Sequence, residues 1–242
     1  MTEADWLTGT EFAAHVGYIA DRLAPRRQRL LAAGFCRAVS HLFDHPDLNA
    51  ALAVVEWYAD GRDSIAELEK ARQRCRVLAQ EAYESYARQV DGGLSGGEQD
   101  VRHELAWAVS FAATSPLPVL MVGTRAANAA VQARTGAGLL VPVATPAFDA
   151  AVAEQSRVMC GVVWDVVGNP FRPVAFAPEW RTDTAVSLAR HIYDRCEFSA
   201  RPILADALQD AGCDSDEVLN HSREPGPHVR GCWVLDGVLG RA

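Results

Sequence analysis

The sequence has no long apolar run: none approaches the ~20 apolar residues that a membrane-spanning helix needs. Its first ten residues, MTEADWLTGT, have neither the basic flank nor the apolar stretch of a secretory signal. A CxxC pair is also absent, and the six cysteines are scattered along the chain. Without an export signal, reduced thiols are the default state. We therefore expect a cytoplasmic protein that does not enter a membrane.

Positive charge is also scarce. The chain has 23 Lys and Arg residues against 31 Asp and Glu residues, a formal net charge of −8. Proteins that bind nucleic acid or anionic membranes in general depend on a basic field, so we expect neither activity. The short arginine clusters at 26–29 and 72–76 lie on expected helices beside acidic residues, and this pattern is typical of a solvated helix face.

A phosphate-binding loop is missing as well. The glycine-rich stretch DGGLSGGEQD (91–100) lacks the Lys-Ser/Thr pair of such a loop and follows an expected helix rather than a strand. The turn VGTRAANAA has too few glycines for a dinucleotide fingerprint. The sequence therefore predicts no nucleotide cofactor.

The apolar residues that are present recur mainly at helical spacing. Leu31, Phe35 and Leu42 lie on one helix face, and Pro25 suits the first turn of that helix. Similar stripes follow Pro46, the Ser64/Glu67 capping pair and the glycine-rich stretch. With 49% hydrophobic residues in 242, the chain can bury a sizeable core. We expect a mainly α, all-α fold.

Two regions interrupt this pattern. Residues 115–146 contain SPLPVLMVG and TGAGLLVPVAT, each of which could be a short strand or irregular, on either side of a good helix former. The segment GNPFRPVAFAPEW carries three prolines, so it should be extended. We place a boundary there, between a helical body (1–168) and a smaller C-terminal helical unit (169–242) packed on it. Helices are expected in that unit at about 182–195, 202–211, 216–222 and 228–239.

Several segments resemble a known family. MTEADWL, RRQRLLAAGFCRAVSHLF, NPFRPVAFAPEWRTDTAVSLARHIYD, RPILADALQDAGC and GPHVRGCWVLDGVLG are similar to a family of hypothetical proteins abundant in planctomycete bacteria such as Gemmata. The family has no known activity, so the resemblance implies a fold and no mechanism. Its members often carry adjacent cysteines where this chain has Phe35-Cys36, and a cysteine where it has Ser222. These departures count against a metal site that needs those thiols.

One stretch near the C-terminus holds candidate metal ligands: Cys213, His221, His228 and Cys232. Two cysteines and two histidines could form the tetrahedral set that zinc prefers. On one helix, His228 and Cys232 would share a face, since they are four residues apart. The spacing C-x7-H-x6-H-x3-C matches no common zinc finger. Zinc is therefore an alternative, and no cofactor is the main expectation.

Two other interpretations of the same stretch stay open. Cys232 with His228 could form a catalytic thiol–base pair, because a nearby histidine can lower a thiol pKa. Alternatively, Cys232 lies on an inward stripe with Leu235 and Leu239, where a thiol packs as a small hydrophobe. We favour burial, and we interpret Asp236 as a surface acid.

Asp165 is unusual because it lies among apolar residues in VMCGVVWDVVG, and a buried carboxylate needs a partner. We favour a structural ion pair with Arg172, which follows the helix end, so that the pair would join the body and the C-terminal unit. Exposure on the outer face of the helix is the main alternative, and a catalytic acid is a further one.

Abundant amphipathic helices without a convergent catalytic signature favour a non-catalytic function. We expect a protein-interaction or scaffold module whose partner is another protein. The alternative is a zinc-binding or thiol-dependent protein centred on the Cys/His stretch. The sequence does not determine the oligomeric state.

Overall fold

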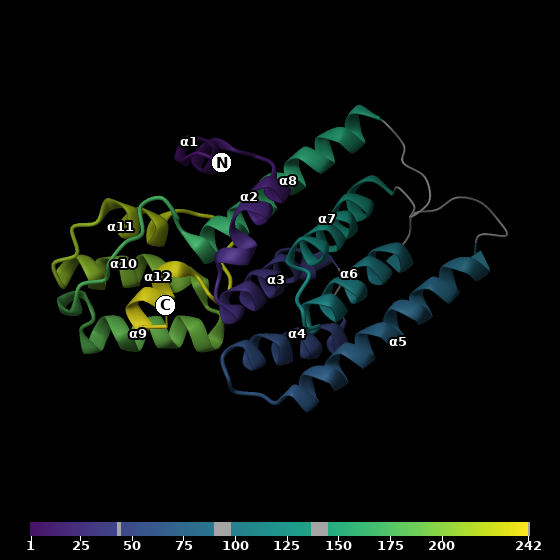
Figure 1. Ribbon diagram of the computed structural model, residues 1–242, viewed down its shortest axis with the longest axis horizontal. Coiled ribbons are helices and arrows are strands. Elements are labelled where there is room, and N and C mark those ends of the chain that lie inside the picture. The colour runs from purple at the N-terminus through teal and green to yellow at the C-terminus, as the bar shows by residue number, and fades with distance from the viewer. Residues whose placement is uncertain (43–44, 90–97, 137–144, 242) are drawn as a thin grey trace. The chain divides into compact units, whose positions relative to one another are not determined.

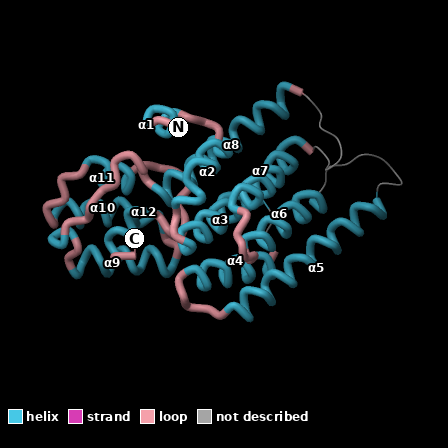
Figure 2. The backbone as a smooth tube through the Cα atoms, viewed as in Figure 1, coloured by secondary structure: helices cyan, strands magenta, loops and turns pink. Residues whose placement is uncertain are grey.

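A computed structural model describes residues 1–42, 45–89, 98–136 and 145–241 of the chain. In these ranges the chain forms twelve α-helices with turns and short 3-10 segments between them, and no strand (Figure 2). The all-α prediction is therefore confirmed. No helix within these ranges is both long and apolar enough to cross a bilayer. The chain divides into two compact units, Met1–Val163 and Trp164–Ala242.

In the N-terminal unit, successive helices from α3 to α7 pack side by side (Figure 1). Its helices are α1 (Glu3–Thr8), α2 (Phe12–Ile19), α3 (Pro25–Val39), α4 (Pro46–Ala59), α5 (Ile65–Gln89), α6 (Glu98–Ala112), α7 (Val119–Thr135) and most of α8 (Pro146–Val167). Helix α3 contacts α4, α6 and α7, and for that reason its residues from Leu30 to Cys36 are all buried. A helix that is covered on several sides in this way forms the centre of a core.

Most of the expected stripes in this unit are confirmed among the described residues, but Leu42 is only half-buried, because α3 ends at Val39 and Leu42 lies in the 3-10 segment that follows. Leu48, Leu52 and Val55 of α4 are buried, and Gly61 follows the helix end. The Ser64 hydroxyl accepts a hydrogen bond from the Glu67 backbone N–H at 3.2 Å, so the predicted cap opens α5.

The region that the sequence left open, 115–146, is partly helical. VLMVG forms the first residues of α7, so it is neither a strand nor irregular. Most of TGAGLLVPVAT and of DGGLSGGEQD lies outside the described residues. Val152 of α8 is 44% exposed, because Gln155 and Ser156 occupy the inward face of this part of the helix.

The C-terminal unit contains α9 (Asp183–Arg195), α10 (Arg201–Asp210), α11 (Asp216–Arg223) and α12 (Trp233–Leu239), preceded by the last turn of α8. Helix α10 packs against α9 and α11, and α12 also packs against both α9 and α11. Their inward side chains form one hydrophobic core, whose largest members include Tyr193, Leu204, Leu208, Trp233 and Leu235. This core holds together the elements that carry the site described below.

The last helix begins later than predicted. It starts at Trp233 instead of about residue 228, with Cys232 at its N-cap position. Gly231 has φ +94°, a left-handed conformation that a regular helix does not contain, and the Cys232 N–H donates to the Val229 carbonyl in a turn. His228 and Cys232 therefore do not share a helix face.

The division between the units lies inside α8, between Val163 and Trp164, and not between 168 and 169. The boundary predicted from the sequence lies at 169 because the proline-rich segment changes the composition of the chain there, whereas nothing in the composition marks residue 163. In agreement with this division, Asp165 in the last turn of α8 bonds to His221, His228 and Val229 of the second unit.

Candidate metal centre

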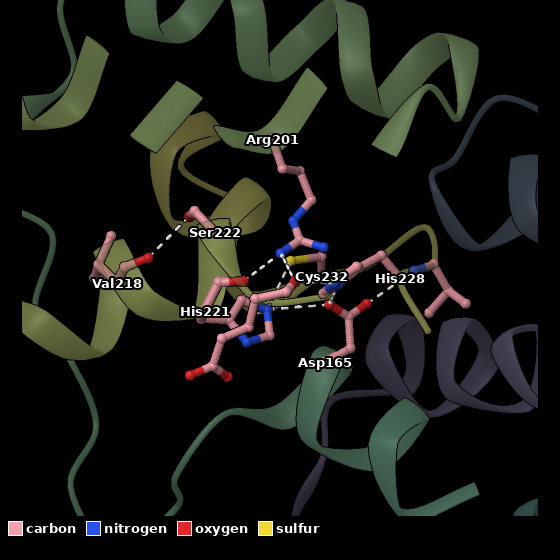
Figure 3. Close-up of polar contacts among 9 residues, drawn as sticks. Asp165, Arg201, Val218, His221, Ser222, His228 and Cys232 are labelled. Carbon is pink, nitrogen blue, oxygen red and sulfur yellow. Dashed lines mark hydrogen bonds and ion pairs between the residues drawn. The ribbon is translucent and has the colours of Figure 1, made fainter. Parts of the chain in front are cut away.

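Four polar side chains converge in the C-terminal unit: Asp165, His221, His228 and Cys232. We call them the ligand cluster. Asp165 lies in the last turn of α8, His221 in the last turn of α11, His228 in the loop after α11, and Cys232 at the start of α12 (Figure 3). Their candidate ligand atoms all lie within 4.8 Å of one another.

The sequence of α11 explains how His221 reaches this position. Ser215 caps the helix, since its hydroxyl accepts from the Val218 N–H at 3.4 Å. Val218 and Ser222 are buried, so they fix the rotation of the helix, and the Ser222 hydroxyl donates to the Val218 carbonyl. His221, next to this inward face, is held at the edge of the core with its ring beside Trp233.

Asp165 forms the centre of the hydrogen bonding. Its Oδ1 lies 3.1 Å from His221 Nε2 and 2.6 Å from His228 Nδ1. Its Oδ2 accepts the Val229 backbone N–H at 2.8 Å. The carboxylate is 1% exposed, so these contacts take the place of the water that a charged group would otherwise need.

His221 contacts the thiol through the same nitrogen. Its Nε2 lies 3.4 Å from Cys232 Sγ as well as 3.1 Å from Asp165 Oδ1. One ring nitrogen offers either one proton or one lone pair, so it cannot serve both neighbours fully by hydrogen bonding. A cation between them would instead accept electron pairs from the nitrogen, the sulfur and the carboxylate together.

His228 shows a related conflict. Its Nδ1 faces the Asp165 carboxylate, and its Nε2 lies 3.3 Å from the Glu224 carbonyl oxygen. Because both neighbours are acceptors, a neutral imidazole can donate to only one of them. Two states resolve this: an imidazolium paired with Asp165, or a neutral ring with metal on Nδ1 and its Nε2–H donated to Glu224. The second is the usual arrangement around metal-bound histidine.

Arg201 supports the backbone that carries both histidines. Its Nη2 donates to the carbonyls of His221 and Glu224, the latter at 3.2 Å (Figure 3). The side chain is 3% exposed, and this burial lowers the pKa of the guanidinium, whereas the neighbouring Cys232 and Asp165 favour its charged form.

Cys232 is fully buried, and burial raises the pKa of its thiol well above the ordinary value; the charge of Asp165 acts in the same direction. Without a metal ion the thiol is therefore protonated and unreactive. A bound cation reverses this situation, because a coordinated thiol loses its proton.

Three of the four ligands named from the sequence are thus brought together, with Asp165 in place of Cys213. Cys213 lies in the hydrophobic core of the unit, with its backbone N–H bonded to the Leu208 carbonyl. Cys232 and His228, the candidate catalytic pair, both belong to the cluster, but it is His221 that contacts the thiol.

Sequence reasoning missed Asp165 as a member of this group. The signal was present, because a carboxylate within an apolar stretch must find a partner. The predicted partner, Arg172, is wrong: the carboxylate bonds to His221, His228 and Val229, which the fold brings beside the end of α8. Asp236, expected at the surface, is only 1% exposed.

Comparisons with protein-family models, with curated proteins and with solved structures gave no match. The resemblance to planctomycete proteins stays a prediction.

Proposed function

We propose that the C-terminal unit binds one transition-metal ion, with zinc the best fit, through the four side chains of the ligand cluster. The observation that carries this proposal is the convergence of one carboxylate oxygen, two imidazole nitrogens and one sulfur within 4.8 Å. Nitrogen, sulfur and oxygen are the donor atoms that zinc takes from proteins.

The spacing of the atoms suits a tetrahedral ion. Zinc bonds of about 2.0–2.1 Å to nitrogen or oxygen and about 2.3 Å to sulfur place ligand atoms roughly 3.3–3.6 Å apart. The distances from His221 Nε2 to Asp165 Oδ1 and to Cys232 Sγ, 3.1 and 3.4 Å, are near that range. The 2.6 Å contact of His228 Nδ1 with Oδ1 would have to open by about 0.7 Å to reach it.

The charges also balance. A thiolate at Cys232 and a carboxylate at Asp165 supply two negative charges, which neutralise a divalent cation. Both side chains are at most 1% exposed, and an uncompensated charge there would be costly. Zinc, favoured by thiolate and imidazole together, meets this requirement better than magnesium or calcium, which prefer oxygen ligands.

We assign the ion a structural role. Four protein ligands fill a tetrahedral shell and leave no open position for a water or a substrate, as in structural zinc sites. The ion would link the end of α8, the end of α11 and the start of α12. Its binding energy would then contribute directly to the folding of the C-terminal unit.

Thiol catalysis receives less support. In a catalytic triad the histidine uses one nitrogen for the nucleophile and the other for the carboxylate. His221 directs the same nitrogen, Nε2, at both Cys232 and Asp165. The thiol is also fully buried and its pKa is raised, so it is neither accessible nor activated.

The protein-interaction or scaffold role expected from the sequence stays a second proposal. It is compatible with a structural metal, because zinc often stabilises small modules without taking part in chemistry. Exposed apolar side chains such as Ile203 do not identify a partner, since isolated examples are normal on protein surfaces.

Metal content after purification in the presence of zinc tests the proposal. We expect one zinc per chain in the wild-type protein and loss of that zinc in Cys232→Ser and Asp165→Asn. Mass spectrometry under native conditions gives the stoichiometry, and circular dichroism shows whether each variant is still helical.

Cys213→Ser is the matched control, since Cys213 is also a buried cysteine of the C-terminal unit but lies outside the ligand cluster. It should keep its zinc. Folded wild-type protein that binds no metal would refute the proposal, and zinc loss in Cys213→Ser but not in Asp165→Asn would restore the ligand set named from the sequence.

A further inference from the structure

A cavity of about 470 Å³ lies in the C-terminal unit at the first turn of α10 and the end of α11. Its lining includes Phe198, Arg201, Pro202, Arg223 and His228. The volume is in the range of pockets that hold small molecules. The cavity reaches His228 of the ligand cluster, but it is otherwise formed by residues that play no part in metal binding.

Arg201 gives the cavity its chemical character. Its guanidinium carries five N–H donors, and the hydrogen bonds to the His221 and Glu224 carbonyls use Nη2 alone. Among the described residues, Nε and Nη1 have no hydrogen-bond partner. A buried, permanently charged group with donors to spare is suited to bind an anion.

The rest of the lining limits the kind of anion. Phe198, Pro202 and Pro225 supply apolar walls, which favour a ligand with an apolar body. Arg223 adds a second positive charge, partly neutralised because it bonds to Asp206 at 2.8 Å and to Gln209 at 2.7 Å.

Glu224 also lines the cavity and is the one acidic residue among its lining. Its side chain is exposed, so its carboxylate can remain in solvent. Two arginines and this glutamate are the charged residues of the lining apart from His228, while Asp206 bonds to Arg223 and the buried Asp165 lies near Arg201. The first turn of α10 adds the positive end of a helix dipole on the same side.

We propose that this cavity is a binding site for a small organic anion, whose carboxylate or phosphate group bonds to Arg201 and whose apolar part lies against Phe198. The inference goes beyond the metal centre and does not rest on it, because Arg201 is charged whether or not an ion is bound. Carboxylates and phosphates can both accept hydrogen bonds from a guanidinium, and the experiment below distinguishes between them.

Titrations followed by NMR of the backbone amides test the proposal on the full chain, both zinc-loaded and after chelation. The probes are benzoate, its uncharged analogue benzamide, phenyl phosphate and inorganic phosphate. We expect saturable shifts at Ser199, Arg201 and Ser222 with an aromatic anion, binding about tenfold or more tighter than benzamide. Whichever of benzoate and phenyl phosphate binds more tightly identifies the anionic group.

Arg201→Gln should weaken the binding of that anion by about tenfold or more, whereas Arg190→Gln, on the exposed side of α9 and outside the cavity, should leave it unchanged. If Arg201→Gln does not fold, the comparison of benzoate with benzamide shows whether binding depends on the negative charge of the ligand. Phe198→Ala shows whether binding depends on the apolar wall of the cavity. Equal binding of benzoate and benzamide, equal binding of inorganic phosphate and phenyl phosphate, or no saturable shift would each overturn the proposal. Failure of the metal centre alone would leave these expectations intact.

Discussion

At the scale of the single residue, Arg201 is a buried cation in the C-terminal unit. It is 3% exposed, and it bonds to the carbonyls of His221 and Glu224 at the end of α11, where the last carbonyls have no partner inside the helix. A buried cation is tolerated only where such acceptors and nearby negative charges compensate for its lost hydration. Arg201 therefore holds in place the segment that carries His221 and His228.

Replacing Arg201 with methionine should lower the stability of this unit. The substitution keeps the side-chain length but removes the hydrogen bonds that the guanidinium donates to the His221 and Glu224 carbonyls, so we expect a loss of about 2–3 kcal/mol. Urea-dependent hydrogen exchange of the α11 amides measures it. Arg190→Met, at an exposed position, should change the same quantity by less than about 0.5 kcal/mol. Equal effects of the two substitutions would contradict this role of Arg201.

Glu104 of α6 should make the stability of the N-terminal unit depend on pH. Burial raises the pKa of its carboxyl above the ordinary value of 4.5, and the ion pair with Arg125 at 2.8 Å only partly opposes this. The folded chain thus keeps this proton at pH values where the unfolded chain has lost it. Its contribution to stability must fall as the pH rises from 4.5 through the folded pKa.

Relative to Glu104→Gln, the wild-type protein should therefore gain free energy of unfolding as the pH is lowered from 7 towards 4.5. Urea unfolding at a series of pH values measures the difference, and the subtraction removes the contributions of other carboxylates. A difference that stays constant, or that grows with rising pH, would show that Glu104 does not titrate as proposed.

The residues of the ligand cluster show what sequence can and cannot reveal at this scale. His221, His228 and Cys232 are visible as metal-ligating types within twelve residues. Asp165 is visible as a buried acid, but its distance in sequence hides its partners, because only the packing of α11 beside the end of α8 brings them together. Cys213, as a cysteine, is an equally suitable zinc ligand by residue type. Only the fold shows that it lies in the hydrophobic core.

At the scale of the element, two glycines in helices have opposite surroundings. A Cβ on Gly237 of α12 would lie 2.1 Å from the Phe176 ring, so the helix can approach this ring only with glycine there. A Cβ on Gly17 of α2 would meet no atom within 4 Å. Replacement of glycine by alanine should therefore change the stability of the protein in opposite directions at the two positions.

Gly17→Ala should stabilise the protein by about 0.5–1 kcal/mol, because alanine loses less backbone entropy in a helix. Gly237→Ala should destabilise it by about 1–3 kcal/mol, because the overpacking of Phe176 outweighs that gain. Chemical denaturation of both variants and the wild type measures the signs. Stabilisation by Gly237→Ala would mean that α12 and Phe176 are not packed as described.

The helices themselves were largely predictable, because apolar spacing and caps act locally. The stripes of α4, α5 and α6 and the Ser64 cap all form as the sequence indicates. The start of α12 was not predictable in this way. His228 and Cys232 have helical spacing, but the left-handed conformation of Gly231 interrupts the helix between them. The pair still converges, through a turn and not a helix face, because Val229 and His228 both bond to Asp165.

At the scale of the whole molecule, metal binding should act on one unit only. The ligand cluster belongs entirely to the C-terminal unit, and no comparable group occurs elsewhere among the residues that the structure describes. A ligand that binds only the folded state adds about 4 kcal/mol of stability at a thousand times its dissociation constant. Zinc should thus protect the C-terminal unit and leave the N-terminal unit unchanged.

Hydrogen exchange with zinc or with a chelator measures this difference. We expect zinc to slow exchange in α10 and α11 of the wild type and of Cys213→Ser, with no change in α3 and α6. The same zinc should have no effect on Cys232→Ser. Equal protection of both units would indicate a general effect of zinc and not a specific site.

The first coordination shell of the ion tests the central claim most directly. An X-ray absorption spectrum at the zinc edge reports the number, type and distance of the ligand atoms. One sulfur at about 2.3 Å and three nitrogen or oxygen atoms at about 2.0–2.1 Å is the predicted result for Asp165, His221, His228 and Cys232. Two sulfurs would show that Cys213 or another cysteine is a ligand, and a shell without sulfur would show that Cys232 is not; either result would contradict the proposed centre.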